Sequence, residues 1–161
     1  MDASTCLWYE ETRFGRIGIR EQADSIVRLY LPGEIAEKGV CQWRSALLAD
    51  AFRQLREYFD GFRTRFDLPL APQGTAFMRS VWNALCTIPY GQTVSYREVA
   101  AQIGNPRAVR AVGMANHRNP IPILIPCHRV IGSHGDLVGY AGGLDLKAAL
   151  LKLELCGLRN R

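Results

Sequence analysis

Three short apolar-rich runs lie near the start of the chain. These runs are Cys6–Glu10, Gly15–Glu21 and Ser25–Leu31, and they have the composition that is typical of strands. Only three residues separate the last two runs, and Pro32-Gly33 follows the third. The pattern therefore predicts a small antiparallel meander that ends at this Pro-Gly pair.

The next pattern has the period of a helix. Between Leu47 and Phe59 apolar residues recur on one face, and Gly61 is suited to end the helix. We expect the aromatic side chains of this face to lie in the core, and Cys41 to be a packing or surface residue. The segment Asp67–Gly74 then contains two prolines and a glycine, which predicts a linker. We therefore expect two domains, residues 1–70 and residues 71–161.

Helical patterns dominate the second domain. Thr75 is suited to cap a helix that runs to about Thr87, and a last helix is predicted over Asp145–Cys156, with Gly157 ending it. Glu154 lies near the end of this last helix, where the helix dipole disfavours a carboxylate. The whole pattern predicts a mixed α/β (α+β) fold with a small N-terminal antiparallel sheet and helix, and a mainly helical C-terminal domain.

Two short helices in the middle of this domain form a helix-turn-helix pattern. Ser95 and Glu98 resemble a capping box for the first helix, and Gly104 stops it. Asn105 is suited to cap the second helix, with Pro106 at its first position. Such a pair is typical of a DNA-binding helix-turn-helix, although many helical hairpins bind nothing.

The second of these helices has a face of small residues. A small face lets a helix approach a DNA groove closely, and arginines on the same element would supply charge, but alanines also serve close packing between helices. The sequence leaves both interpretations open. The residues concerned are Ala108, Ala111 and Ala115, with Arg107, Arg110 and Arg118 on or near the helix.

Composition narrows the class of protein. The chain has 161 residues, of which 48% are hydrophobic and 22% charged, as in globular proteins, and no apolar run is long enough to span a membrane. The first five residues lack the basic start and apolar stretch of a signal peptide, so we expect a cytoplasmic protein, or a nuclear one if the source has a nucleus. The five cysteines form no C-x-x-C pair and accompany three histidines, so we expect reduced thiols and no metal site.

The net charge of +5 is concentrated in the second domain. Residues 1–71 hold ten basic and eleven acidic residues, whereas residues 72–161 hold ten basic and only four acidic ones. A positive surface attracts polyanions such as DNA, and it also serves solubility. Charge alone does not separate these two roles.

One stretch combines a nucleophile with a base. The apolar run Ile121–Ile125 predicts a buried strand, and Cys127-His128-Arg129 follows it directly. A free thiol is only slightly ionised at neutral pH, so it needs a neighbouring base or cation to become a nucleophile. Neighbouring residues of a strand point to opposite faces, and most free cysteines are core residues. On the Cys-His pair alone, a structural role is favoured.

Several motifs in one order change this interpretation. Between Gly74 and about Gly157 the chain resembles the O6-alkylguanine-DNA alkyltransferases (methylated-DNA–protein-cysteine methyltransferases), and the Pro-Cys-His-Arg-Val run is highly specific for them. The motifs are Pro89-Tyr90-Gly91, Ser95-Tyr96, Arg110-Ala111-Val112-Gly113, Asn119-Pro120, Ile125-Pro126-Cys127-His128-Arg129-Val130 and Gly139-Tyr140-Ala141-Gly142-Gly143-Leu144.

The resemblance implies a reaction that consumes the protein. Cys127 would take the alkyl group from O6-alkylguanine, less certainly from O4-alkylthymine, as a stable thioether, in one turnover and without a cofactor. His128 would help to deprotonate Cys127 through a water molecule, and Glu154 would orient His128. Tyr96 would be a proton donor to the departing guanine, and Asn119 would brace the active-site turn.

The resemblance also implies how the alkylated base is reached. A winged helix-turn-helix in domain 71–161 would enter the minor groove of duplex DNA as a monomer, and the base would flip out of the stack. Arg110 would fill the space left there, and domain 1–70 would be mainly structural. The implied DNA-binding residues are Arg110, Ala108, Ala111, Gly113 and Ser95; the implied base pocket comprises Tyr140, Ala141, Val130 and Ser133, with the Cys127 and Val130 carbonyls suited to the guanine amino group.

The chain departs from the family at the end of the second helix, and three other functions compete. Met114, His117 and Arg118 stand where smaller residues are common, which bears on DNA affinity rather than on the reaction. A non-catalytic lesion-binding protein would lack the acceptor cysteine. A transcription regulator would usually carry a further DNA-binding or cysteine–zinc domain, and a cysteine hydrolase would turn over repeatedly.

Overall fold

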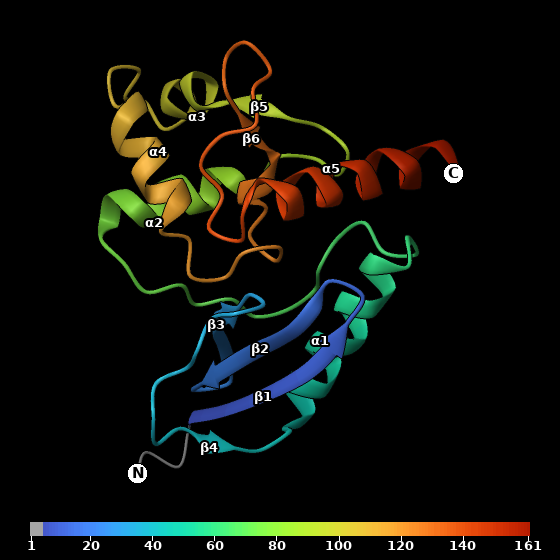
Figure 1. Ribbon diagram of the computed structural model, residues 1–161. Helices are drawn as coiled ribbons and strands as arrows, with labels where there is room; N and C mark the ends of the chain where they lie inside the picture. Colours follow the sequence, from blue (N-terminus) through green and yellow to red (C-terminus); the bar gives the residue numbers. More distant parts are fainter. Residues whose placement is uncertain (1–4) are drawn as a thin grey trace. The chain divides into compact units, whose positions relative to one another are not determined.

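The computed structural model describes residues 5–161, so residues 1–4, which underlie most of the signal-peptide expectation, lie outside the described residues. The chain forms two compact units, one ending at Pro72 and the other beginning at Gln73 (Figure 1). Among the described residues, no helix combines the length and the apolar character that a membrane span needs.

The first unit is built on a four-stranded sheet. Strands β1 (Thr5–Thr12), β2 (Gly15–Gln22) and β3 (Ser25–Tyr30) pair antiparallel, which confirms the predicted meander. A further strand, β4 (Cys41–Gln42), pairs parallel with β1 and completes the order β3-β2-β1-β4. The sequence pattern missed β4 because two residues carry no periodicity.

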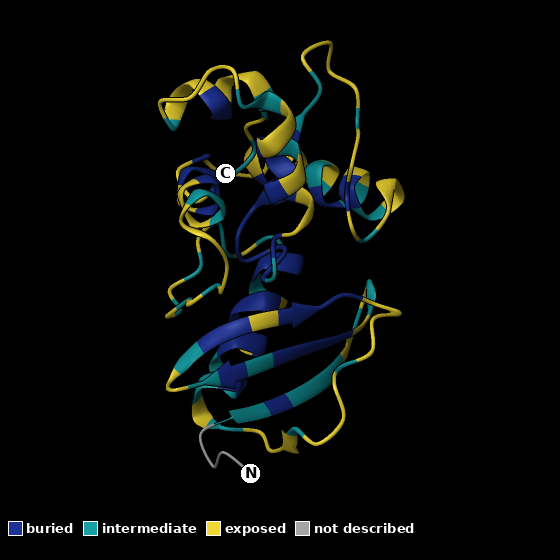
Figure 2. Cartoon of the chain, turned by 90° about the vertical axis from the view of Figure 1, so that its left-hand side faces the viewer, coloured by how far each residue is buried: buried dark blue, intermediate teal, exposed yellow. Residues whose placement is uncertain are grey.

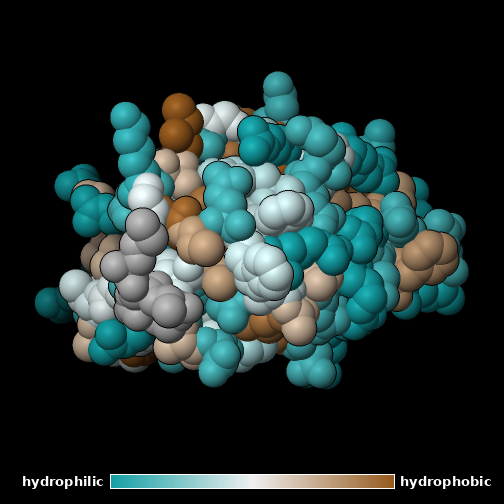
Figure 3. All heavy atoms as spheres, turned by 90° about the horizontal axis from the view of Figure 1, so that it is seen from below, coloured by the Kyte–Doolittle hydropathy of each residue, from teal (hydrophilic) through white to brown (hydrophobic). Residues whose placement is uncertain are grey.

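Helix α1 (Ala46–Phe59) packs against this sheet, as its apolar face predicts. The Ser45 side chain caps it by accepting a hydrogen bond from the Leu48 amide. In Figure 2 most buried residues of this unit lie on the strands and the helix, and the loops are largely exposed. On the face seen in Figure 3, hydrophobic side chains lie singly or in small groups among hydrophilic ones. The apolar face of α1 includes the buried Leu48, Ala51, Phe52, Leu55, Tyr58 and Phe59.

The predicted linker belongs partly to the first unit. The Ile26 amide donates to the Pro69 carbonyl at 2.8 Å, and the Ala71 amide donates to the Ile26 carbonyl at 2.8 Å. The chain from Pro69 to Ala71 therefore extends the edge of the sheet beside β3. The prolines that suggested a free linker are compatible with an edge position, because an edge strand leaves one side of its backbone unpaired.

The second unit is mainly helical, and the two-domain α/β architecture is confirmed. Two short strands pair parallel within it, and helices α3 and α4 form the helix-turn-helix (Figure 1). The predicted Thr75 cap and the Ser95–Glu98 capping box are both present. Its elements are α2 (Ala76–Leu85), β5 (Val94–Ser95), α3 (Tyr96–Gln102), α4 (Val109–His117), η1 (Cys127–Arg129), β6 (Val130–Ile131) and α5 (Leu144–Arg159).

Two predicted helix boundaries were wrong. Helix α4 begins at Val109 rather than at Pro106, because the Ala108 amide donates to the Asn105 carbonyl and closes a separate turn. Ala108 is therefore the residue before α4. Helix α5 continues through Gly157 to Arg159. Gly157 allows close packing instead of ending the helix, since a Cβ there would collide with the Tyr90 hydroxyl.

The predicted buried strand at Ile121–Ile125 was also wrong. This segment is buried, but it is a tight turn in which the Ile125 amide donates to the Ile121 carbonyl at 2.9 Å. Prolines at 120, 122 and 126 remove three of the amide donors that a strand would need. The turn forces Ile123 to a φ of 73°, which a β-branched residue rarely adopts.

Candidate active site around Cys127

The strained turn before Cys127 is held by one side chain. Asn119 is buried, its Nδ2 donates to the Ile125 carbonyl at 2.9 Å, and its Oδ1 accepts from the Ile121 amide at 3.0 Å. These bonds close a ring across the turn. Such over-determination is what allows a residue like Ile123 to remain in an unfavourable backbone conformation. Asn119 thereby fixes the direction in which the chain enters Cys127.

Cys127 lies at the first position of the 3₁₀ helix η1 and is only 3% exposed. Burial raises the pKa of its thiol to about 11, while the Asn119 side chain, the Lys147 ammonium and the backbone N–H groups of Cys127 and His128 act in the opposite direction. The thiol form is therefore favoured in the resting protein, so Cys127 must lose a proton before it can act as a nucleophile.

His128 lies behind Cys127 and contacts a buried carboxylate. Its Nε2 is 2.9 Å from Glu154 Oε1, and both side chains are 0% exposed. Burial lowers the pKa of His128, so the imidazole is neutral at pH 7. Because Glu154 can only accept, the proton of a neutral His128 resides on Nε2 and the basic lone pair on Nδ1. The structure thus brings His128 and Glu154, two of the three residues expected to act in the transfer, into direct contact.

Arg129 shares the same carboxylate. Its Nε lies 3.1 and 3.0 Å from the two Glu154 oxygens, and its Nη2 lies 2.8 Å from Oε1. The Arg129 Nη1 donates to the Ile88 carbonyl at 2.6 Å, and the Gly91 amide donates to Glu154 Oε2 at 3.0 Å. Both carboxylate oxygens of Glu154 therefore accept hydrogen bonds, which offsets the unfavourable helix dipole near the end of α5. The sequence pattern had suggested that Arg129 acts on Cys127, whereas its guanidinium pairs with Glu154.

The contacts of Glu154 make the free energy of unfolding depend on pH. Burial raises the pKa of Glu154, but hydrogen bonds and charges from His128 and Arg129 outweigh it and lower the pKa from 4.5 to about 2. A carboxyl with a depressed folded pKa binds fewer protons when folded than when unfolded. It contributes stability above its unfolded pKa, and this contribution is lost as the pH falls from about 4.5 toward about 2.

Chemical denaturation at several pH values tests this linkage. We expect the free energy of unfolding to fall as the pH drops below 6.5, because His128 is protonated in the unfolded chain but stays neutral when buried. It should fall more steeply between pH 4.5 and 2, where Glu154 is protonated in the unfolded chain only. The lower part of this slope should be smaller in Glu154→Gln. A slope that is the same in this variant and the native chain would contradict the assignment.

A buried lysine completes the surroundings of Cys127. Lys147 on α5 is 0% exposed, and its Nζ donates to the carbonyls of Val130 at 2.6 Å and Val138 at 2.8 Å. Burial lowers the pKa of this amine, while the Cys127 sulfur raises it. The ammonium is the cation that acts on the Cys127 thiol. Nothing in the sequence marks Lys147, because an isolated lysine in an amphipathic helix usually points to solvent.

The segment between β6 and α5 passes over Tyr96. The Tyr96 hydroxyl donates to the Val138 carbonyl at 3.1 Å, the same carbonyl that binds Lys147. Burial raises the pKa of Tyr96. Of the residues implied for a base pocket, Val130 and Tyr140 are buried, whereas Ala141 and Ser133 are exposed in this segment. The Val130 carbonyl, expected to accept from a guanine amino group, already accepts from Lys147.

Helix α4 carries the residues that were expected to contact DNA. Arg110 and Ala111 are exposed, and Gly113 is partly buried, with Tyr96 the nearest neighbour that a Cβ would meet, at 3.9 Å. Ser95 caps α3. The alanines divide between groove approach and helix packing. Ala111 is exposed and free to face a groove. Ala115 is buried and serves packing, since the Trp82 Nε1 donates to its carbonyl at 2.9 Å.

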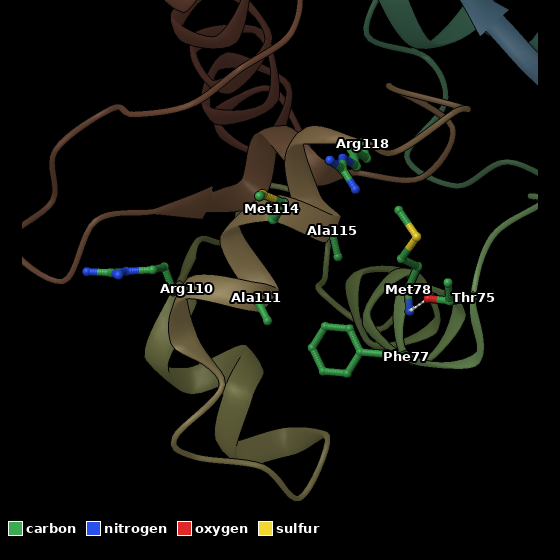
Figure 4. A pocket seen from close by; sticks show the side chains of 8 residues that line it. All are labelled: Thr75, Phe77, Met78, Arg110, Ala111, Met114, Ala115 and Arg118. Carbon is green, nitrogen blue, oxygen red and sulfur yellow. Dashed lines mark hydrogen bonds between the residues drawn. The ribbon is translucent and has the colours of Figure 1, made fainter.

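A surface pocket of about 380 Å³ lies between α4 and the start of α2 (Figure 4). Met114, which is 56% exposed, lines it from α4. The departure from the smaller residues of the family therefore lies at the surface rather than in the core. The pocket is lined by Thr75, Phe77, Met78, Arg110, Ala111, Met114, Ala115 and Arg118.

Both units match known protein domains. Residues 76–156 match the family "6-O-methylguanine DNA methyltransferase, DNA binding domain", and residues 8–72 match "6-O-methylguanine DNA methyltransferase, ribonuclease-like domain". Together these matches span most of the chain.

Curated relatives and solved structures agree with these family matches. A methylated-DNA–protein-cysteine methyltransferase of Methanosarcina barkeri is 64% identical over 68% of this chain and 70% of that protein. A constitutive one of Bacillus subtilis is 46% identical over 94% of this chain and 96% of that protein. The crystal structure of Mycobacterium tuberculosis OGT in complex with DNA has a TM-score of 0.90 and 42% identity, covering 94% of each chain.

Proposed function

Since the chain belongs to the 6-O-methylguanine DNA methyltransferase family, we propose that it repairs DNA by moving the alkyl group of O6-alkylguanine irreversibly to Cys127. It is a methylated-DNA–protein-cysteine methyltransferase that acts once. O4-alkylthymine is a second substrate in this proposal. The observation that carries the proposal is the buried series of Cys127, His128 and Glu154 in a domain that matches a DNA-binding family.

The proposed chemistry is a displacement at carbon. The Cys127 proton passes to His128 Nδ1 through a water molecule, and the imidazolium is stabilised by Glu154. The sulfur then forms a bond to the alkyl carbon as the bond from that carbon to O6 breaks, and the electron pair leaves with guanine. Tyr96 gives its proton to the guanine. The thioether that forms cannot be hydrolysed, so Cys127 is not regenerated.

Burial of Cys127 requires the base to leave the duplex. A thiol that is 3% exposed cannot reach an O6 atom inside stacked DNA, so the alkylated nucleotide must flip into the protein. In this proposal α4 enters the minor groove, with Ala108, Ala111 and Gly113 allowing close approach and Ser95 at the start of α3 near the backbone. The loop that includes Ser133, Tyr140 and Ala141 closes over the base. Lesion-containing duplex is the expected partner.

Arg110 is proposed to occupy the gap left by the flipped base. Arg110→Ala should weaken binding to lesion-containing duplex and slow transfer by about 10- to 100-fold, since one inserted side chain and one charge are lost. Single-turnover rates at several DNA concentrations measure both effects. Arg159→Ala, which removes an arginine near the end of α5, is the control. Equal effects of the two substitutions would show that duplex affinity and transfer rate depend on net charge alone, which would contradict the role proposed for Arg110.

The two units have different roles in this proposal. Residues 71–161 bind DNA and carry the transfer chemistry, and residues 1–70 are mainly structural. The protein acts as a monomer in the cytoplasm, at the nucleoid, or in a nucleus if the source has one, where its substrate resides and thiols remain reduced. No cofactor takes part, since the reacting groups are all side chains of the chain or atoms of the DNA.

Stoichiometry tests the proposed function. When increasing amounts of protein are mixed with excess duplex containing O6-methylguanine, the number of repaired lesions should equal the number of protein molecules and then stay constant. Repair that continues beyond one lesion per molecule would favour a turning-over enzyme such as a hydrolase. Tight binding without any repair would favour a lesion-binding protein.

A further inference from the structure

A polar side chain in the last turn of α4 has no role in the chemistry described above. Asn116 is 2% exposed, although most residues buried on this helix are small or apolar. Its Nδ2 lies 3.3 Å from the Cys127 carbonyl. The α4 helix thus reaches the backbone of the acceptor cysteine through this one side chain.

This contact is not needed to satisfy the Cys127 carbonyl. The same carbonyl accepts a hydrogen bond from the Val130 amide. The Asn116 Oδ1, in turn, is buried and has no hydrogen-bond partner among the described residues. A buried amide oxygen without a partner lowers stability, and a leucine of similar size would avoid that cost. Packing alone therefore does not explain an asparagine at this position.

Tyr96 lies beside the same turn of α4, next to Gly113. Burial and the Cys127 sulfur raise the pKa of the Tyr96 hydroxyl, whereas a hydrogen bond from the Asn116 side chain lowers it. The Tyr96 ring packs beside Gly113, one turn before Asn116 on α4, because a Cβ at Gly113 would be in van der Waals contact with it at 3.9 Å. The Tyr96 hydroxyl itself donates to the Val138 carbonyl at 3.1 Å. Its oxygen can therefore accept from Asn116 while its proton points elsewhere.

We propose that Asn116 is a positioning residue of alkyl transfer, whose amide N–H groups hold the Cys127 backbone and the Tyr96 oxygen in one arrangement and stabilise Tyr96 as it loses its proton. This inference rests on the proposed function. As sulfur bonds to the alkyl carbon and O6 leaves with the electron pair, the Tyr96 O–H bond breaks and its proton moves to guanine. The resulting phenolate keeps the electron pair and accepts from the Asn116 Nδ2, until solvent returns a proton.

Replacing Asn116 by leucine separates this role from packing. At saturating lesion-containing duplex, we expect Asn116→Leu to slow methyl transfer by roughly 10- to 100-fold, as for the loss of a hydrogen bond to a charged oxygen. The affinity for the duplex should not change, and the melting temperature should stay equal or rise because an unpartnered buried oxygen is removed. Asn83→Leu, at an exposed position of α2, is the control and should leave the rate unchanged.

A double-mutant cycle with Tyr96→Phe identifies the group through which Asn116 acts. If Asn116 works through the Tyr96 oxygen, Asn116→Leu should slow Tyr96→Phe little further. Replacing Tyr96 in Asn116→Leu by the more acidic 3,5-difluorotyrosine should restore part of the rate. Multiplicative losses in the cycle, or a rate unchanged in Asn116→Leu, would overturn the inference. Absence of transfer in the native chain would instead overturn the proposed function itself.

Discussion

Cys127→Ala should reduce methyl transfer from O6-methylguanine to the uncatalysed background while leaving affinity for the lesion-containing duplex nearly unchanged. The thiol supplies the sulfur of the thioether bond that forms in the proposed reaction, so no neighbouring group can compensate for its loss. It contributes little to DNA binding, because the buried sulfur would meet DNA only through the flipped base. Removing one buried atom should lower stability by about 1 kcal/mol, which leaves the protein folded.

The other cysteines provide a matched control for this result. Cys156 is exposed on α5 and free, so it is the more accessible thiol. Cys156→Ala should transfer methyl groups at the native rate. The comparison uses single-turnover transfer and a binding measurement on the same duplex. Residual transfer in Cys127→Ala that disappears on removing Cys156 would contradict the assignment of Cys127.

Glu154→Gln should slow transfer by about 100- to 1,000-fold, because an amide cannot stabilise the His128 imidazolium that forms when the thiol loses its proton. It should also lower the free energy of unfolding by about 3–5 kcal/mol, since Arg129 is left as a buried cation without its carboxylate. Urea denaturation measures the second effect, and single-turnover kinetics at a temperature where the variant is folded measure the first.

Asp145→Asn is the control for this substitution. Asp145 is exposed in the first turn of the same helix, so losing its charge should change stability by less than about 1 kcal/mol and leave transfer unaltered. A Glu154→Gln variant that is destabilised but transfers at the native rate would reduce Glu154 to a structural partner of Arg129. Retained lesion binding in the slow variant would show that the defect lies in the chemistry.

Local patterns predicted much of the fold. The strand runs, the face of α1 and the caps at Thr75 and Ser95 follow from interactions within a few residues, which a sequence displays directly. The turn at Ile121–Ile125 was mistaken for a strand because apolar composition signals burial, whereas proline and Asn119 decided the conformation. Gly157 stayed helical because Tyr90, distant in sequence, occupies the space beside it.

The site was predictable only as far as its motifs extend. The resemblance nominated Cys127, His128 and Glu154, and the last two are in contact. The pairing of Arg129 with Glu154, the burial of Lys147 and the two contacts of Asn116 depend on side chains that meet across the fold. Nothing in the local sequence distinguishes such a lysine or asparagine from a solvated one.

The raised pKa of Cys127 suits a protein that reacts once. A protonated, buried thiol resists oxidation and stray alkylating agents, since the thiolate is the reactive form. In the proposed complex, the flipped nucleotide brings the alkyl carbon to the thiol, and His128 accepts the proton of the thiol. In the proposed reaction, ionisation of the thiol then depends on Lys147, Asn119 and His128.

Intact-mass spectrometry after mixing with duplex containing O6-methylguanine tests the central claim most directly. We predict that each protein molecule gains one methyl group, that peptide mapping places it on Cys127, and that the guanine is left unmodified in the DNA. An unchanged protein mass with loss of the lesion, or a methyl group on any other residue, would contradict the account.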